Sequence, residues 1–423
     1  MTESSYGRGA AVLSVGIGAT GVITFAYFSL ASHSLSESDY GGITLLWSAV
    51  FITVSVLYRP VEQLLSRTIA DRDARGLEGT EHLRVAATIQ LALGVLFVVA
   101  ALLLRGPIQD DLFGGSERLY WILIVAVLAY AASYFARGYL AGHRRFPLYG
   151  GLVLMEATSR ALFALAVAVG IAEGQGVVAL GIAAAPLVSL LVVPAALARR
   201  SRQAPVASRQ DESPEGEFTL AHGSGFAVAV LLIMLCEQTF LNAGPLLVKA
   251  TEGERGAALA GFAFNVLLIA RAPLQLFQAV QTSILPHLTR LSAGDEGDPF
   301  RRSVNLTLIA IAGFAGVVAL VMLVAGPFVM DLLFGGEGGY DRFGLVLVSL
   351  GMGLYLAAAT LNQALLARAR ARESALCWAA AAVAFVAFLL LPVLDDPVME
   401  VEVGFLGAAL LLGGLLYGQY RRG

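Results

Sequence analysis

One long apolar stretch, residues 261–291, carries polar side chains at positions where a membrane tolerates almost none. They recur at intervals of four, three and four residues, the spacing of one helix face: Arg271, Gln275, Gln278 and Thr282. A charged group that faces lipid at mid-membrane costs roughly 2.5 to 3.5 kcal/mol on insertion scales, so it survives beside a partner or a water-filled cavity. The pattern therefore predicts a helix that forms one wall of a polar path across the membrane.

A second apolar stretch contains Glu156 and Arg160, which lie four residues apart on one predicted helix face. Two interpretations stay open. The two side chains close on each other as an ion pair that contributes nothing to function. Alternatively, the carboxylate holds Arg160 in place inside a cavity that receives an anion, a task that suits the fixed fork of a guanidinium.

A third stretch places Glu237 and Asn242 near mid-membrane. Burial raises the pKa of an acid and a bound cation lowers it again, so a lone intramembrane carboxyl is a candidate for coupling to protons or sodium. The alternative is an acid that is neutralised by Arg271 or Arg160 and has no further role. The candidate ion-coupling residues are Glu156, Glu237 and Asn242.

Two more arginines complete the set. Arg59 precedes Pro60 at the end of an apolar run, and Arg137 lies about two turns before the His143–Arg145 cluster, from which it either faces the cavity or snorkels to the membrane surface. Guanidinium groups pair with phosphate oxygens, and amides both donate to and accept from hydroxyl groups. The predicted cavity therefore suits an anionic ligand rich in hydroxyls, and its candidate binding residues are Arg59, Arg137, Arg160, Arg271, Gln275 and Gln278.

Composition determines the environment of these groups. The 423 residues are 57% hydrophobic and 14% charged, with a mean hydropathy of +0.76, which indicates an all-α polytopic membrane protein. A membrane-spanning helix needs roughly 20 apolar residues, and about twelve such runs can be placed. They lie near 9–31, 41–66, 83–104, 119–142, 148–172, 177–198, 223–248, 257–290, 303–325, 343–368, 374–394 and 399–420.

Other classes of site find little support. Cys236 and Cys377 both lie in apolar runs, and the chain has no His/Cys cluster with the spacing of metal ligands, so we expect neither a metal nor a cofactor. The net charge of -3 and the scattered basic residues argue against a nucleic-acid partner. Arginines concentrate in alternate loops, for example at Arg144, Arg199 and Arg301, which predicts a cell-membrane protein with both termini in the cytoplasm.

The chain also repeats itself at offsets that grow from about 212 to about 225 residues. Three matches occur in the same order: Arg59 with Arg271, LFGG at 112–115 with LFGG at 333–336, and Tyr130 with Tyr355. They predict two parallel six-helix halves, residues 1–198 and 223–423. The polar segment 199–222, with Pro205 and Pro214, is expected to be a flexible cytoplasmic linker between them.

Several segments resemble one family. These are ARAPLQLFQAVQTSILPHLTRL at 270–291, the two LFGG loops and ARGYLAGHRRFPLYG at 136–150. They are similar to the oligosaccharide flippases of polysaccharide biosynthesis, in the multidrug/oligosaccharidyl-lipid/polysaccharide exporter (MOP) superfamily. The resemblance implies a V-shaped bundle of two halves that works by alternating access on a saccharide carried by a polyprenyl diphosphate. It also implies that the cavity cations are Arg59, Arg137, Arg160 and Arg271.

The sequence thus leads to three hypotheses. The first is a translocase for a lipid-linked oligosaccharide, not an enzyme, with membrane lipid and polysaccharide polymerases or glycosyltransferases as partners. The second is an ion-coupled exporter of drugs or other small molecules, which would favour a more acidic and aromatic pocket. The third is a membrane-embedded polysaccharide polymerase or ligase, which usually needs a larger outer loop than the predicted ones, roughly 5 to 20 residues long.

Overall fold

The computed structural model describes residues 3–77, 79–191, 220–271, 297–335, 339–368, 370–391 and 393–422. Within them the chain is all-α, as predicted. Nine helical segments are long and apolar enough to cross a membrane, and two shorter apolar helices cover Gln175–Ser189 and Gly256–Arg271. The protein is therefore a multi-pass membrane protein. Gln275, Gln278 and nearly all of the predicted linker lie outside the described residues.

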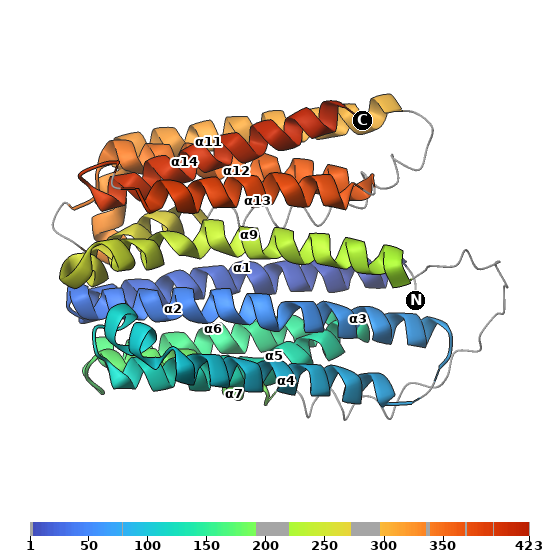
Figure 1. Cartoon of the computed structure of the whole chain (residues 1–423), viewed down its shortest axis with the longest axis horizontal. Helices are drawn as coiled ribbons and strands as arrows, with labels where there is room; N and C mark the ends of the chain where they lie inside the picture. The colour runs from blue at the N-terminus through green and yellow to red at the C-terminus, as the bar shows by residue number, and fades with distance from the viewer. Residues whose placement is uncertain are drawn as a thin grey trace. The chain divides into compact units, whose positions relative to one another are not determined.

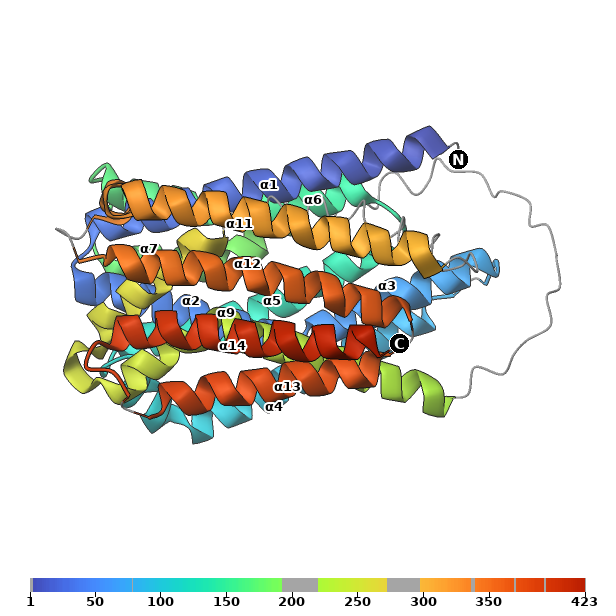
Figure 2. The same cartoon turned by 90° about the horizontal axis from the view of Figure 1, so that it is seen from above.

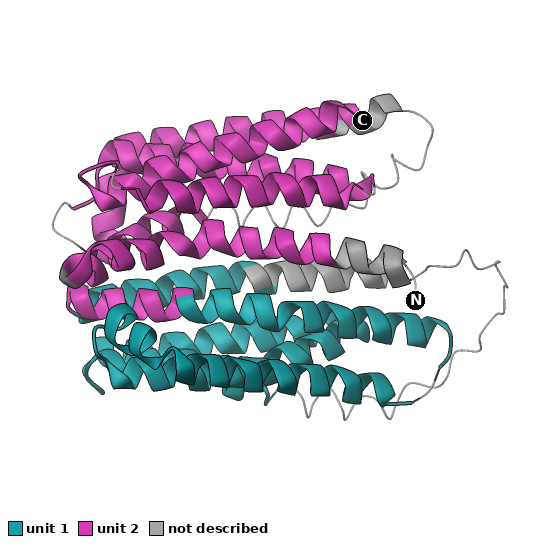
Figure 3. Cartoon of the chain, in the orientation of Figure 1, with its two compact units in different colours: residues 1–35, 49–218 teal, residues 36–48, 219–423 magenta. Residues whose placement is uncertain are grey.

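By its contacts the chain divides into two compact units (Figure 3). Unit 1 comprises residues 1–35 and 49–218, and unit 2 comprises residues 36–48 and 219–423. The predicted division into residues 1–198 and 223–423 stays a prediction, and so does the internal repeat. Helix α2 belongs to both units, because its first half is grouped with unit 2 and its second half with unit 1. No sequence pattern predicted this sharing.

Within each unit the helices lie side by side along a common direction (Figures 1 and 2). The first part of the chain forms α1 (Glu3–Ser34), α2 (Glu37–Leu57), α3 (Arg59–Ala74), α4 (Glu81–Leu103), η1 (Pro107–Leu112), α5 (Glu117–Gly142), α6 (Phe146–Ala168) and α7 (Gln175–Ser189). The remainder forms α9 (Leu220–Thr251), η3 (Gly253–Arg255), the Gly256–Arg271 helix, α11 (Gly297–Phe334), α12 (Arg342–Ala367), α13 (Ala371–Leu389) and α14 (Pro397–Arg421).

Local sequence signals explain where several helices begin. Ser116 accepts a hydrogen bond from the backbone N–H of Leu119 at the start of α5, and Asp341 accepts one from Gly344 at the start of α12. Asp396 does the same for the first turn of α14, and Pro397 follows it at a position that needs no N–H donor. These caps satisfy backbone groups that the helix itself leaves unpaired.

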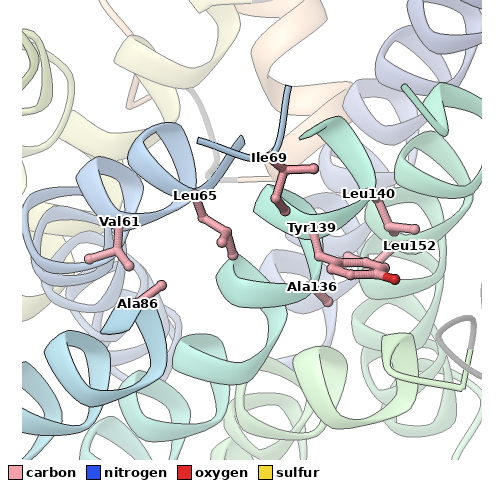
Figure 4. Close-up of a cluster of buried hydrophobic side chains, with 8 residues drawn as sticks. All are labelled: Val61, Leu65, Ile69, Ala86, Ala136, Tyr139, Leu140 and Leu152. Atoms are coloured by element: carbon pink, nitrogen blue, oxygen red, sulfur yellow. The ribbon is translucent and has the colours of Figure 1, made fainter. Parts of the chain in front are cut away.

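In unit 1, α6 packs against α1 and α7, and α5 packs against α3 and α7. Figure 4 shows the apolar core at one end of this unit, which is formed by Val61, Leu65, Ile69, Ala86, Ala136, Tyr139, Leu140 and Leu152. The contact between α3 and α5 is close because Gly138 has no side chain. A Cβ atom there would lie 2.8 Å from the backbone oxygen of Glu62. This packing brings the polar groups of α3, α5 and α6 together.

In unit 2, α12 packs against α11 and α14, and α13 packs against α9 and α14. Phe240 of α9 lies at the centre of a buried aromatic cluster and stacks on Phe385 with a centroid distance of 5.5 Å. The other members of the cluster are Tyr355, Trp378 and Phe405. Edge-to-face and offset contacts of this kind add stability beyond the burial of apolar area.

Candidate functional site

Unit 1 contains a buried ionic centre around Glu156 of α6. This residue is 2% exposed. Its carboxylate accepts a close hydrogen bond from Arg137 Nη2 and another from Ser133 Oγ, both on α5. The Ser189 hydroxyl of α7 lies 3.4 Å from the same carboxylate and 2.7 Å from the carbonyl oxygen of Pro186, so its proton can serve either acceptor. Three helices therefore meet at one acid.

The ion pair of Glu156 joins two helices. Its partner is Arg137, whereas the i, i+4 spacing on α6 had suggested Arg160. The side chain of Arg137 is 12% exposed and lies over the ring of Tyr134, 4.7 Å from its centroid, so it does not snorkel to the membrane surface. A buried pair of this kind costs much desolvation and is stable only with further hydrogen bonds, which Ser133 supplies.

Arg160 lies on the same helix as Glu156 and is 4% exposed. Its Nη1 donates to the hydroxyl of Tyr130 at 2.7 Å, and its guanidinium carbon is 5.9 Å from the centroid of the Phe51 ring. Arg160 therefore meets neutral aromatic groups where Arg137 meets a carboxylate. The two cations predicted for one cavity occupy different environments in unit 1.

A second acid lies in the first turn of α3. Glu62 accepts a hydrogen bond from the Tyr149 hydroxyl of α6 at 3.0 Å. Arg59, the first residue of α3, is half-buried one turn earlier. The structure thus brings Arg59 and Glu62 of α3 into the same unit as Arg137, Glu156 and Arg160.

Unit 2 contains a different kind of arginine. Nε and Nη2 of Arg271 are both buried, and neither has a hydrogen-bond partner among the described residues. The guanidinium carbon lies 5.8 Å from the centroid of the Phe264 ring. An arginine carries five N–H donors and stays charged, so a buried guanidinium with open donors is costly unless an anion binds to it.

The acid of α9 is more exposed than the two amides of the same helix. Glu237 is half-buried, whereas Gln238 is 9% and Asn242 is 3% exposed. Asn242 Nδ2 donates to Gln238 Oε1 at 3.1 Å, and Asn242 Oδ1 is buried without a hydrogen-bond partner in the described part of the chain. Among the described residues Glu237 makes no ion pair with Arg271, and its neutralisation by Arg160 stays a prediction.

Three hydrogen-bonding residues of the centre in unit 1 were not identified as site residues from the sequence: Tyr130, Ser133 and Ser189. Serine and tyrosine hydroxyls are common in membrane helices. These three residues differ from the others only because their hydroxyl groups face a buried charge. The one local signal is Pro186 inside α7, three residues before Ser189, whose carbonyl oxygen accepts a hydrogen bond from the Ser189 hydroxyl. No group of three or more His, Cys, Asp or Glu side chains in the described part of the chain is arranged to hold a metal ion.

Comparison with known proteins identifies relatives of the chain and structures with the same fold. No protein-family model matches the chain. An uncharacterized protein of Mycobacterium bovis is 27% identical over 410 residues, which cover 92% of this chain and 88% of that protein. An uncharacterized protein of Mycobacterium tuberculosis is 26% identical and covers 86% of this chain and 80% of its own length.

Several solved structures share the fold over nearly the whole chain. An inward-facing multidrug resistance MATE family transporter of the MOP superfamily has a TM-score of 0.69 at 14% identity, covering 97% of each chain. The eukaryotic MATE transporter AtDTX14 has a TM-score of 0.65 at 15% identity, covering 99% of this chain and 98% of its own. A MOP superfamily transporter from Pyrococcus furiosus, described by the reverse polarity of its binding pocket, has a TM-score of 0.56 at 15% identity, covering 98% and 95%. The chain therefore has the all-α fold of MATE transporters of the MOP superfamily.

Proposed function

We propose that this chain, built on the fold of MOP superfamily transporters, is a membrane translocase. It moves a polyprenyl-diphosphate-linked oligosaccharide from the cytoplasmic to the outer face of the cell membrane, in support of surface polysaccharide synthesis. The single observation that carries the proposal is the guanidinium of Arg271, whose Nε and Nη2 are buried and have no hydrogen-bond partner among the described residues. Such a group is retained where an anion visits it.

The chemistry of Arg271 favours an oxyanion. A guanidinium presents parallel N–H donors that match the spacing of phosphate oxygens, and each charge-assisted hydrogen bond is stronger than a neutral one. Phe264 beside it gives a flat apolar surface that leaves the cation unneutralised. A diphosphate bound here would gain hydrogen bonds that the resting protein lacks. Gln275 and Gln278, one and two turns further along the sequence, are proposed to contact sugar hydroxyls.

The ionic centre of unit 1 is proposed to respond to transport. Glu156 neutralises Arg137 in this structure, so a head group that binds Arg137 must compete with an internal carboxylate. Protonation of Glu156 would release the guanidinium, which provides a route for ion coupling. Arg160 and Arg59 complete the proposed cationic lining of this unit. The two units would then rock against each other to expose the substrate on alternate sides.

The decisive experiment uses purified protein in liposomes with a fluorescent polyprenyl-diphosphate oligosaccharide, whose movement is followed by its protection from an impermeant quencher. We expect the wild-type protein to move the lipid and Arg271→Ala to lose this activity, since removing a charge-assisted contact costs about 1.5 to 3 kcal/mol, or roughly 10- to 150-fold. The matched control is Arg255→Ala, an exposed arginine of η3 in the same unit. Full activity of Arg271→Ala would remove the central role of this residue.

A second candidate is an ion-coupled exporter of small molecules. It is favoured by the multidrug resistance transporter that shares the fold. Efflux of cationic dyes from the same liposomes, in the absence of lipid movement, would establish this function in place of the first. Formation of glycosidic bonds by the purified protein would instead establish the polymerase or ligase alternative.

A further inference from the structure

Two hollows lie one after the other along α4 and α5 of unit 1. The first, called here the head pocket, has a volume of about 320 Å³ at the end where α4 begins and α5 ends. Its polar lining comes from Arg72, Asp73, Thr80, His82 and His143. Its inner wall is Ile69 and Tyr139, which Figure 4 shows in the core between α3 and α5.

The second hollow, called here the tail groove, has a volume of about 670 Å³ and is almost entirely apolar. Gly94, Val95 and Val98 of α4 and Leu128 and Ala132 of α5 line it. Its one amide side chain, Gln90, is turned onto the protein itself, because Nε2 donates to the backbone oxygen of Ala131. The one polar atom of this side chain left without a hydrogen-bond partner among the described residues is Gln90 Oε1, and the rest of the lining is apolar.

The two hollows follow each other along both helices. On α4, Leu83 lines the head pocket and Ala87, one turn later, lines the tail groove. On α5, Tyr139 lines the head pocket and Phe135, one turn earlier, lines the tail groove. One turn is about 5.4 Å, so a ligand with a polar end and a long apolar chain can occupy both.

The tail groove opens on a surface that faces hydrocarbon. Leu91, Val95 and Leu96 of α4 are 70%, 56% and 61% exposed, on a helix whose hydropathy is typical of a membrane span. Apolar side chains exposed to this extent on a membrane helix contact lipid chains. The occupant of the groove is accordingly an acyl chain and not a peptide or a soluble molecule.

The head pocket selects the charge of that lipid. The segments 67–84 and 143–145 contain six arginines and two histidines against four acids. Within the pocket Arg72 is half-buried whereas Asp73 is exposed, and Arg72 Nη2 lies 3.3 Å from the site that a Cβ of Gly79 would occupy. Thr80 and His82, at the start of α4, also line the pocket, so the positive end of this helix dipole lies beside it.

We propose that the head pocket and tail groove together bind one anionic phospholipid of the surrounding membrane. Its phosphodiester lies beside Arg72 and the first turn of α4, and one acyl chain runs along α4 and α5. Basic pockets between membrane helices bind anionic head groups by the same electrostatics. The site is distinct from Arg271 and does not depend on the identity of the transported substrate.

The test is native mass spectrometry of the full-length protein titrated in micelles with phosphatidylglycerol or phosphatidylcholine. We expect one phosphatidylglycerol to bind more tightly than phosphatidylcholine. Arg72→Gln should weaken phosphatidylglycerol about fivefold, the effect of roughly 1 kcal/mol for one cation near a head group. The control Arg75→Gln removes an exposed arginine of the same region that pairs with Asp71, and should leave the preference intact.

A second pair of variants tests the tail groove. Val95→Trp fills the groove, whereas Leu96→Trp adds the same bulk to an equally exposed neighbour outside it. We expect only Val95→Trp to lower lipid retention, and Arg271→Ala to leave it unchanged. Equal binding of the two lipids, equal losses in Arg72→Gln and Arg75→Gln, or equal losses in the two tryptophan variants would overturn the proposal. Circular dichroism of each variant shows whether it retains its helical fold.

Discussion

The guanidinium of Arg137 on α5 donates to the carboxylate of Glu156 on α6, deep inside unit 1. The two residues are 19 positions apart in the sequence and belong to helices that the sequence alone treats as separate apolar runs. Because each neutralises the other, unit 1 has a charge-balanced core at this point. Arg271 of unit 2 has no such balance among the described residues. The contrast leads to opposite expectations for variants of the two arginines.

Glu156→Gln should destabilise the protein strongly. The change leaves the Arg137 charge buried without its partner, and breaking one side of a buried pair costs about 3 to 5 kcal/mol. The double variant Arg137→Gln, Glu156→Gln should recover much of the loss. Thermal unfolding in detergent measures both. The control is Glu117→Gln, whose pair with Arg105 is 46% and 63% exposed and contributes about 1 kcal/mol or less. Equal losses at both sites would contradict the buried pair.

Arg271→Leu should make the resting protein more stable while abolishing transport. The leucine removes a guanidinium of which two buried donor nitrogens have no partner among the described residues, so we expect a gain of about 1 kcal/mol or more in the absence of substrate. The unfolding temperature in detergent is the measurement, paired with the liposome assay. A lower unfolding temperature would show that Arg271 is a structural residue with a partner of its own.

Tyr130→Phe should destabilise unit 1 through Arg160. The phenylalanine keeps the ring but removes the hydroxyl that accepts from Arg160 Nη1, and a buried donor left without its acceptor costs about 1 to 3 kcal/mol. Tyr417→Phe, on the exposed face of α14, is the matched control. Chemical denaturation of both variants gives the difference. An unchanged free energy of unfolding in Tyr130→Phe would mean that this hydrogen bond contributes nothing.

Gly41→Ala should disrupt the attachment of the first half of α2 to unit 2. A Cβ atom at this position would lie 1.8 Å from the backbone oxygen of Ala257, so the two helices must separate. The nearby hydrogen bond from Tyr40 to Asn265 depends on the same approach. Overpacking of this kind costs about 1 to 3 kcal/mol or more in thermal unfolding.

Gly151→Ala of α6 is the counterpart of that variant. A Cβ atom there meets nothing within 4 Å, so alanine should stabilise its helix by about 0.5 to 1 kcal/mol. If Gly41→Ala and Gly151→Ala unfold alike, the close contact between residues 41 and 257 does not form.

Much of the fold is readable from the sequence because a membrane imposes it. Residues such as Leu91 and Val95 recur in runs long enough to span a bilayer, and backbone groups in lipid must bond within a helix. These two constraints are the reason that the all-α polytopic class could be predicted from the sequence. The division of α2 between two units was not readable, because it depends on which helix faces meet and not on how apolar α2 is. The same holds for the close packing of α5 on α3 at Gly138.

For the candidate site, the sequence by itself determined which charged residues lie at membrane depth, since the cost of placing Arg137, Glu156, Arg160 or Arg271 in lipid marks each of them. It did not determine their partners. Spacing along one helix suggested Arg160 for Glu156, but a carboxylate pairs with the cation that packing brings nearest, and that is Arg137 on the next helix. Only the tertiary structure decided which arginine is neutralised and which keeps open donors, because hydrogen bonds form between atoms a few ångströms apart whatever their separation in the chain.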